Sequence, residues 1–178
     1  SAAIDSMVVG EPNLENCEMG PMISQRQRER VQGFLERAKS HKHLEFLSGK
    51  QKLNPNGFFL PPTIVTGARH EDELVQKEIF GPVITITRFQ DEAQALQWAN
   101  GVDYGLSASV WTRDLDKAMR ATKYLHFGCV WVNDHGTLVS EMPHGGFKNS
   151  GYGKDMSSYA LDDYTDAKHV MVRLGALS

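Results

Sequence analysis

The stretch VITITRFQDEAQALQWANGVDYGLSASVWTRDLDKAMRATKYLHFGCVWV, residues 83–132, decides the predicted fold. It alternates apolar segments typical of strands with polar, helix-compatible segments, and the loops between them are short. This alternation predicts a parallel sheet covered by helices on both faces, an α/β fold in which ligands bind beyond the carboxyl ends of the strands. The predicted strands are 83–89, 106–111 and 129–132, and the predicted helices are 91–100 and 114–125.

An amphipathic helix is predicted upstream, over residues 24–40. Four apolar residues recur there at helical spacing, and Ser24 and Gln27 have the spacing of a capping box. A short strand is expected at 44–47. The apolar residues of that helix are Val31, Phe34, Leu35 and Ala38.

The end of the chain has the pattern of another strand. Val170, Val172 and Leu174 alternate with Met171 and Arg173, which predicts a half-buried strand over 168–174. No nearby segment offers it a partner, so the edge of another sheet or another subunit is expected to pair with it.

Composition excludes several classes of protein. The 178 residues are 40% hydrophobic and 23% charged with a net charge of −3, so neither nucleic acid nor an acidic membrane is an expected partner. No apolar run approaches the roughly 20 residues of a membrane span, and the first ten residues do not have the features of a signal peptide. Two cysteines make no disulfide framework. A cytoplasmic location is therefore predicted.

Several reactive side chains are assigned no role. His41 and His43 lie in a charged loop without a metal-binding frame, so no metal is predicted. Cys129 lies in an apolar run and Cys17 is flanked by two acids, so neither is an activated nucleophile. The Gly-rich segment after residue 143 fits no phosphate-binding pattern.

The motif EIFGPV, residues 78–83, is the best candidate site. Gly-Pro fixes a turn before a strand, so Glu78 and Phe80 are expected on a rigid rim. A carboxylate there can accept two hydroxyl groups of a ribose, and a ring can flank a flat heterocycle. The alternative is a surface glutamate beside a core phenylalanine.

Several short segments along the chain match, in order, segments of one protein family. The chain resembles the C-terminal part of the NAD(P)-dependent aldehyde dehydrogenase superfamily, and the segment from 141 to 165 is most similar to the aminoaldehyde branch, which includes 4-aminobutyraldehyde dehydrogenase. The blocks follow the family's order: VVGEP…MGPMIS, GFFLPPTIV, EIFGPV, YGLSASVWTRDLDKAMR, GCVWVND, MPHGGFKNSGYGKD and YTDAKHVMV.

This resemblance implies a cofactor site and a substrate tunnel. Glu78 would bind the hydroxyls of the nicotinamide ribose of NAD, with NADP not excluded; Phe80 would pack near the nicotinamide, and Gln27 would reach the adenosine ribose. Leu138 and His144 match positions that line the aldehyde tunnel. The acids Asp134 and Glu141 in the same segment are candidates to meet a substrate ammonium.

The resemblance also implies a division of the chain and a reaction. Residues 1–160 match part of the catalytic domain, and 161–178 match an oligomerisation arm that joins a partner subunit. In the family a cysteine attacks the aldehyde, hydride passes to the nicotinamide, and a glutamate activates water. Neither Cys17 nor Cys129 matches that nucleophile, so no catalytic residue is assigned and the chain alone is expected to be inactive. The missing N-terminal half of the enzyme is then a partner. The alternative is a non-catalytic binding or assembly module.

Overall fold

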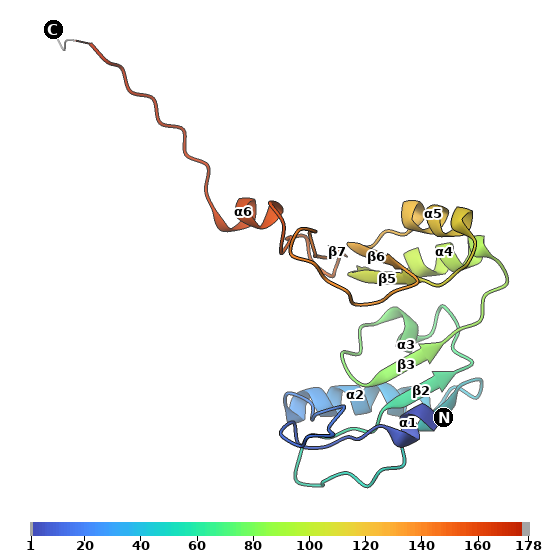
Figure 1. The fold of residues 1–178 in the computed structure, drawn as a ribbon. Helices are drawn as coiled ribbons and strands as arrows, with labels where there is room; N and C mark the ends of the chain where they lie inside the picture. Colours follow the sequence, from blue (N-terminus) through green and yellow to red (C-terminus); the bar gives the residue numbers. More distant parts are fainter. Residues whose placement is uncertain (1, 176–178) are drawn as a thin grey trace. The chain divides into compact units, whose positions relative to one another are not determined.

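The computed structural model describes residues 2–175 (Figure 1). Its backbone contacts form two compact units, the first ending at Asp103 and the second beginning at Tyr104, and each unit is described by itself. The boundary expected after residue 160 falls within a helix of the second unit, and that domain assignment stays a prediction. No helix in the described range is both long and apolar enough to cross a membrane.

The first unit is built on a three-stranded sheet in the order β1-β2-β3. The strands are β1 (Glu45–Ser48), β2 (Thr63–Thr66) and β3 (Val83–Ile86). β1 runs antiparallel to β2, and β2 runs parallel to β3 with Val65 opposite Thr85. The helices of this unit are α1 (Ala2–Ser6), α2 (Gln25–Ala38), α3 (Glu73–Gln76) and α4 (Glu92–Asn100).

The core of the first unit lies between α2 and β2. Val31 of α2 and Val65 of β2 are completely buried. α2 begins where predicted, because the Ser24 side chain accepts a hydrogen bond from the backbone N–H of Gln27. The buried members of this core are Val31, Phe34, Ala38, Leu44, Leu60, Val65, Ala68, Leu74 and Ile79.

The second unit contains a strand-helix-strand motif. β5 (Ser107–Val110) and β6 (Cys129–Val132) pair in parallel and are connected by α5 (Leu115–Tyr124), whose N-cap is Asp114, the first residue of the helix predicted there. A second, two-stranded sheet pairs β4 (Tyr104–Gly105) with β7 (Phe147–Lys148), and α6 (Tyr159–Tyr164) follows.

The predicted α/β class and the parallel pairing of β5 with β6 through α5 are confirmed, but the described strands form separate small sheets in place of one parallel sheet. β3 pairs with β2, whereas β5 pairs with β6, and one strand pair of the first sheet is antiparallel. Ile84 and Ile86 alternate away from the core and are 63% and 48% exposed. The fold is a mixed α/β fold with small sheets. The pairing was not predicted because local periodicity identifies strands but does not determine their partners.

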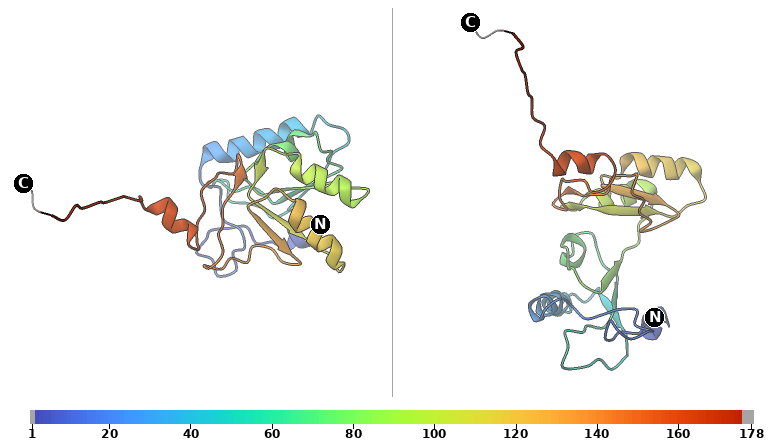
Figure 2. Two further views of the ribbon diagram at one scale, coloured as in Figure 1. Left: turned by 90° about the horizontal axis from the view of Figure 1, so that it is seen from above. Right: turned by 60° about the vertical axis from the view of Figure 1, so that its left-hand side comes forward.

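The predicted strand over 168–174 is also absent. Residues 165–174 form neither helix nor strand, and every residue from 161 to 175 is exposed. In both views of Figure 2 this segment leaves α6 as an extended chain. Since Val170 and Val172 are each 71% exposed, the segment is not half-buried in the described chain. Pairing with another subunit stays a prediction.

Candidate functional site

The loop of residues 78–81, between α3 and β3, is held by two side chains of α2. The Gln27 amide donates from Nε2 to the carbonyl oxygens of Ile79 at 3.2 Å and Phe80 at 2.9 Å. The Arg30 guanidinium donates to the carbonyl oxygens of Ile79 at 2.6 Å and Glu78 at 2.7 Å. Three consecutive carbonyl groups are therefore fixed by one helix, so the loop has little freedom to move.

The same loop contains a strained aromatic residue between two close-packed ones. Phe80 has a φ of 56°, in the left-handed region that bulky residues avoid. Ile79 before it is buried in the core, and a Cβ on Gly81 after it would lie 2.6 Å from Val31 Cγ2. The Phe80 ring is nevertheless 70% exposed. Strain of this kind persists only where the surroundings impose it, and it is frequent at ligand sites.

The Glu78 carboxylate is free to bind a ligand. Its residue is exposed, and the side chain has no hydrogen bond or ion pair to any residue in the range 2–175. Next to the loop, a shallow pocket of about 370 Å³ is lined by Pro21, Met22, Ile23, Gln27, Phe80 and Gly81. The structure thus brings Phe80 and Gln27 together around a pocket, with Glu78 adjacent in the chain.

Arg30 is a residue that the sequence did not identify. A charged residue on an amphipathic helix is ordinarily a solvated one, and Arg30 is exposed. The available signal was its spacing, because Arg30 follows Gln27 by three residues and shares its helix face. The backbone N–H of Gln27 donates to the side chain of Ser24 at the helix cap, whereas its side-chain amide donates to the 78–81 loop.

In the second unit, His144 lines a pocket of about 630 Å³. Its backbone forms an isolated antiparallel bridge with Asp155, with N···O distances of 2.9 and 2.7 Å. Its ring nitrogen Nδ1 is buried and has no hydrogen-bond partner. Lys154 closes part of the same pocket, since its Nζ donates to the Gly146 carbonyl at 2.9 Å. An unsatisfied buried nitrogen costs free energy, so a polar ligand group there would be favourable.

The loop of residues 133–137 follows β6 and is held both by bonds to neighbouring segments and by bonds within the loop. Asn133, with a φ of 54°, forms two hydrogen bonds through its side-chain amide with the backbone of Thr112. Trp131 Nε1 donates to the Thr137 carbonyl at 2.8 Å. Hydrogen bonds from the Thr137 side chain and from the backbone N–H of His135 lower the pKa of Asp134. The Asp134 carboxylate is therefore already engaged.

The other residues assigned to the substrate tunnel are exposed. Leu138 is 47% exposed, and Glu141 has no bonded partner among the described residues. Neither of them lines the His144 pocket, nor does Asp134. The cofactor candidates thus share one surface of the first unit, whereas the four substrate candidates of the second unit are not gathered in one pocket.

Neither cysteine has the features of a nucleophile. Burial raises the pKa of the Cys129 thiol, which favours the unreactive protonated form. The Cys17 thiol lies 3.4 Å from the carbonyl oxygens of both Gly10 and Met19, where it acts as a weak donor.

Comparison with known proteins gives these features a context. A family model described as the aldehyde dehydrogenase family matches residues 1–170. Aldehyde dehydrogenase of Emericella nidulans is 39% identical over 167 residues, which cover 94% of this chain and 33% of that protein. Betaine aldehyde dehydrogenase of Sinorhizobium fredii is 36% identical over 173 residues, which cover 96% of this chain and 36% of that protein.

Solved structures agree with the sequence comparison. Betaine aldehyde dehydrogenase from Staphylococcus aureus, solved in complex with NAD+, is 32% identical with a TM-score of 0.87 over 95% of this chain and 34% of its own. A variant of aldehyde dehydrogenase from Bacillus cereus is 34% identical with a TM-score of 0.86 over 93% of this chain and 33% of its own. The chain thus spans about one third of the length of the relatives it matches. From the family model, the sequence relatives and the fold together, the chain belongs to the aldehyde dehydrogenase family.

Proposed function

We propose that this chain forms the nicotinamide-ribose side of an enzyme that oxidises an aldehyde to its carboxylic acid with NAD. The observation that carries the proposal is the unpaired Glu78 carboxylate on a loop whose three carbonyl groups are fixed by Gln27 and Arg30. A site that positions a cofactor for reaction needs such a rigid acid, because small displacements of reacting groups lower the rate strongly.

The residues present fit the ribose and the ring of a nicotinamide nucleotide. The two oxygens of Glu78 can accept two neighbouring hydroxyl groups, with charge-assisted hydrogen bonds that contribute about 1.5–3 kcal/mol each. The exposed Phe80 ring offers an apolar contact to a flat heterocycle. When bound, the nicotinamide accepts the hydride of the aldehyde; Glu78 and Phe80 restrict its orientation. NADP stays an alternative, because the side-chain amide of Gln27, the residue expected to reach the adenosine ribose, is bonded to the 78–81 loop.

We also propose an aminoaldehyde as the substrate. The support is the sequence similarity of residues 141–165 to that branch, together with the free carboxylate of Glu141. Glu141 is the better candidate to meet an ammonium group, because Asp134 already accepts hydrogen bonds from Thr137 and His135. His144 and Leu138 would then line the path of the aldehyde.

The remaining parts of the reaction lie outside the residues assigned above. The nucleophile and the general base would come from the other two thirds of a protein of the relatives' length, and the extended segment 165–175 would pair with a second subunit. A binding or assembly module without chemistry is the competing function, favoured by the exposure of that segment.

A chimeric enzyme tests the proposal. This chain would replace the matching third of the Emericella nidulans enzyme, and NADH formation from an aldehyde would be followed in single turnover. We expect an active chimera. Glu78→Gln should lower the hydride-transfer rate about 30-fold, since each of two hydrogen bonds weakens by about 1 kcal/mol. An active chimera with an unchanged rate in Glu78→Gln would contradict the role of Glu78, and a folded, inactive chimera would favour the assembly module.

The substrate proposal is tested on the same chimera. Glu141→Gln should raise KM for 4-aminobutanal more than for butanal, whose chain has the same length without the charge. Asp134→Asn is the matched control and should change both KM values alike. Equal effects of Glu141→Gln on the two aldehydes would leave only shape as the basis of selection.

A further inference from the structure

Three metal-ligating side chains meet at the end of α2 and the start of α3. His43 Nε2 lies 2.9 Å from Asp72 Oδ2 and 3.1 Å from Asp72 Oδ1. The edge of one imidazole faces the other, with ring centroids of His41 and His43 5.5 Å apart and an interplanar angle of 83°. One donor atom from each of the three side chains lies within 4.8 Å of the other two.

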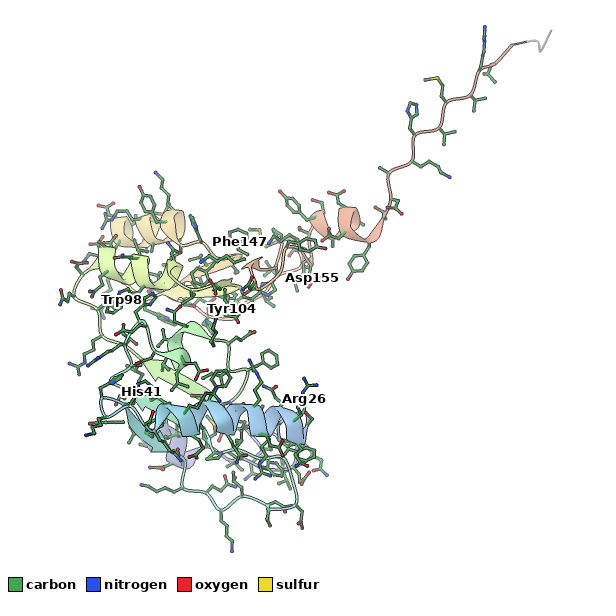
Figure 3. All side chains as sticks on the ribbon, turned by 180° about the vertical axis from the view of Figure 1, so that it is seen from behind. Arg26, His41, Trp98, Tyr104, Phe147 and Asp155 are labelled. Atoms are coloured by element: carbon green, nitrogen blue, oxygen red, sulfur yellow. The ribbon has the colours of Figure 1, made fainter. Side chains whose placement is uncertain are left out.

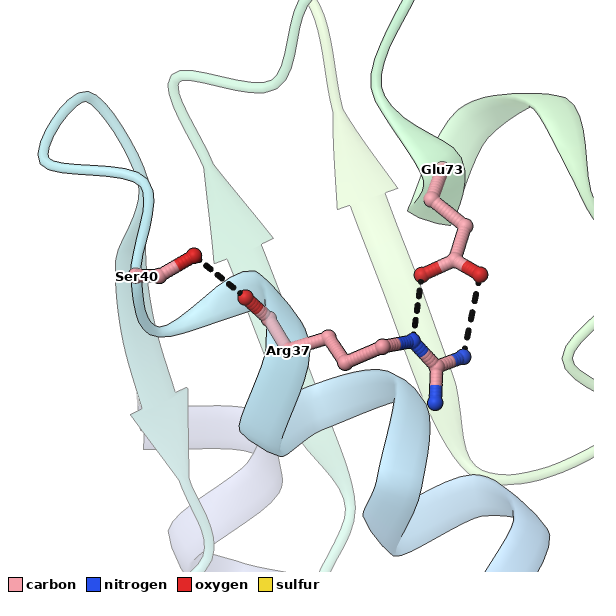
Figure 4. Close-up of polar contacts among 3 residues, drawn as sticks. All are labelled: Arg37, Ser40 and Glu73. Carbon is pink, nitrogen blue, oxygen red and sulfur yellow. Dashed lines mark hydrogen bonds and ion pairs between the residues drawn. The ribbon is translucent and has the colours of Figure 1, made fainter.

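The backbone on both sides of this cluster is rigid. In the turn that carries the histidines, the N–H of His41 donates to the Ala38 carbonyl at 3.0 Å and that of Leu44 to the His41 carbonyl at 3.1 Å. Figure 4 shows that Ser40 adds a side-chain hydrogen bond to the carbonyl oxygen of Arg37 in the last turn of α2. The backbone that carries the two histidines is therefore ordered before any ion arrives, which favours binding.

Asp72 is fixed by hydrogen bonds. Its Oδ2 accepts a hydrogen bond from the backbone N–H of Arg69 at 2.7 Å, and its backbone carbonyl starts α3. The guanidinium of Arg37 on α2 pairs with Glu73 and not with Asp72, because its Nε and Nη2 are bonded to both oxygens of Glu73, as Figure 4 also shows.

The cluster is open to solvent on one side only. The side chain of Asp72 is 7% exposed and that of His43 is 24% exposed, while His41 is an exposed residue. Figure 3 shows His41 beyond the far end of α2 from Arg26. An ion can therefore enter past His41, and water can complete its coordination there.

We propose that His41, His43 and Asp72 bind a divalent first-row transition-metal ion, with Zn²⁺ as the best match. Two imidazole nitrogens and one carboxylate oxygen, plus water, are a common zinc donor set. Metal–ligand bonds of about 2.0–2.2 Å in a tetrahedron place donor atoms about 3.3 Å apart. The separation of His43 from Asp72 is close to this value, so only the exposed His41 side chain has to approach.

The ion would add a link between two segments that the His43–Asp72 hydrogen bond and the Arg37–Glu73 ion pair already join. It would tie the turn after α2 to Asp72, and α3 leads from there to the 78–81 loop. No metal-binding frame is visible in the sequence, because Asp72 follows His43 by 29 residues and His41 by 31. This site includes none of the residues proposed for the cofactor, so the two proposals stand or fall separately.

Titration calorimetry of the full chain, freed of metal with a chelator, tests the site with ZnCl₂. We expect one Zn²⁺ per chain and a higher thermal midpoint with the ion. His41→Ala should weaken binding at least about tenfold, since even indirect partners of metal ligands cost 10–100-fold. His169→Ala, which removes another exposed histidine, is the matched control and should bind like the parent chain.

A second measurement, with Co²⁺, distinguishes the loss of metal binding from the loss of the fold. Co²⁺ in a four-coordinate nitrogen and oxygen site absorbs visible light strongly, and these bands should appear in the parent chain and in His169→Ala but not in His41→Ala. Asp72→Asn should also lose them while its circular dichroism stays unchanged. No bound Zn²⁺ in the parent chain, or equal affinities of His41→Ala and His169→Ala, would overturn the proposal.

Discussion

The 78–81 loop and the 133–137 loop differ in which residues hold them in place. Each adjoins a strand, contains an acid, and places a residue other than glycine at positive φ, 56° at Phe80 and 54° at Asn133. The first loop is held from outside, by Gln27 and Arg30 on a helix. The second is held by bonds to neighbouring segments, such as those between Asn133 and Thr112, and also by Asp134, whose carboxylate accepts hydrogen bonds from within the loop.

The difference indicates which acid is available to a ligand. In the 78–81 loop the backbone is fixed by other residues, so the carboxylate of Glu78 has no structural task. In the 133–137 loop the carboxylate of Asp134 accepts hydrogen bonds that maintain the turn. A ligand could engage Asp134 only by breaking hydrogen bonds that the loop needs, and this would reduce the net gain.

The largest expected effect comes from breaking the close packing of the first loop. Gly81→Ala should destabilise the first unit by about 3 kcal/mol, near the upper end for overpacking, because the new Cβ would meet the fully buried Val31. Urea unfolding measures the change. In the double variant with Val31→Ala the penalty of the added methyl group should shrink by at least about 1 kcal/mol. Additive effects would show that the two residues do not compete for space.

The next effect comes from removing an external anchor. Arg30→Met should cost about 2 kcal/mol, because two charge-assisted hydrogen bonds to the loop are lost while the apolar stem remains. Hydrogen exchange should accelerate within residues 78–81. Arg26→Met is the control, since Arg26 lies on the same helix with no bonded partner among the described residues. Equal stability of the two variants would mean that the loop does not depend on this anchor.

Features that depend on residues close in the chain were predicted from the sequence, whereas features that depend on distant residues were not. The helix start at Ser24, the helix predicted over 114–125 and the strand Cys129–Val132 depend on neighbours in the chain and were predicted. The partner of β3 was predicted wrongly, because an apolar run does not specify which strand pairs with it.

The candidate site shows the same limit. The motif identified Glu78 and Phe80, but the contact of Arg30 with their loop joins residues 48 and 49 positions apart, and no pattern in the sequence reports it. The strand expected at 168–174 lacks a partner among the described residues, so its alternation alone did not make a strand. Long-range contacts decide these features, and they require the fold.

A smaller effect isolates the strain in the first loop. Phe80→Gly should be about 1 kcal/mol more stable than Phe80→Ala, because glycine alone relieves the positive φ while both variants remove the ring. Urea unfolding of the pair gives the difference directly. If the alanine variant proved as stable as the glycine variant, the loop would have relaxed to negative φ and the strain would not be imposed by Gln27 and Arg30.

The smallest effect concerns the acid of the second loop and depends on pH. Because the pKa of Asp134 in the folded chain is lowered below the ordinary value of 3.8, its bonds stabilise the loop above that pH and are lost as the pH falls through the lowered value. The indole N–H of Trp131, which donates to the Thr137 carbonyl, is a reporter for this loop.

In nuclear magnetic resonance spectra, the indole signal of Trp131 should shift with a midpoint below pH 3.8. Asp134→Asn should abolish this titration, and Trp131→Phe assigns the signal. A midpoint at or above the ordinary aspartate value would mean that the carboxylate is free in solution. Asp134 would then be as available to a substrate ammonium as Glu141, and the contrast between the two loops would disappear.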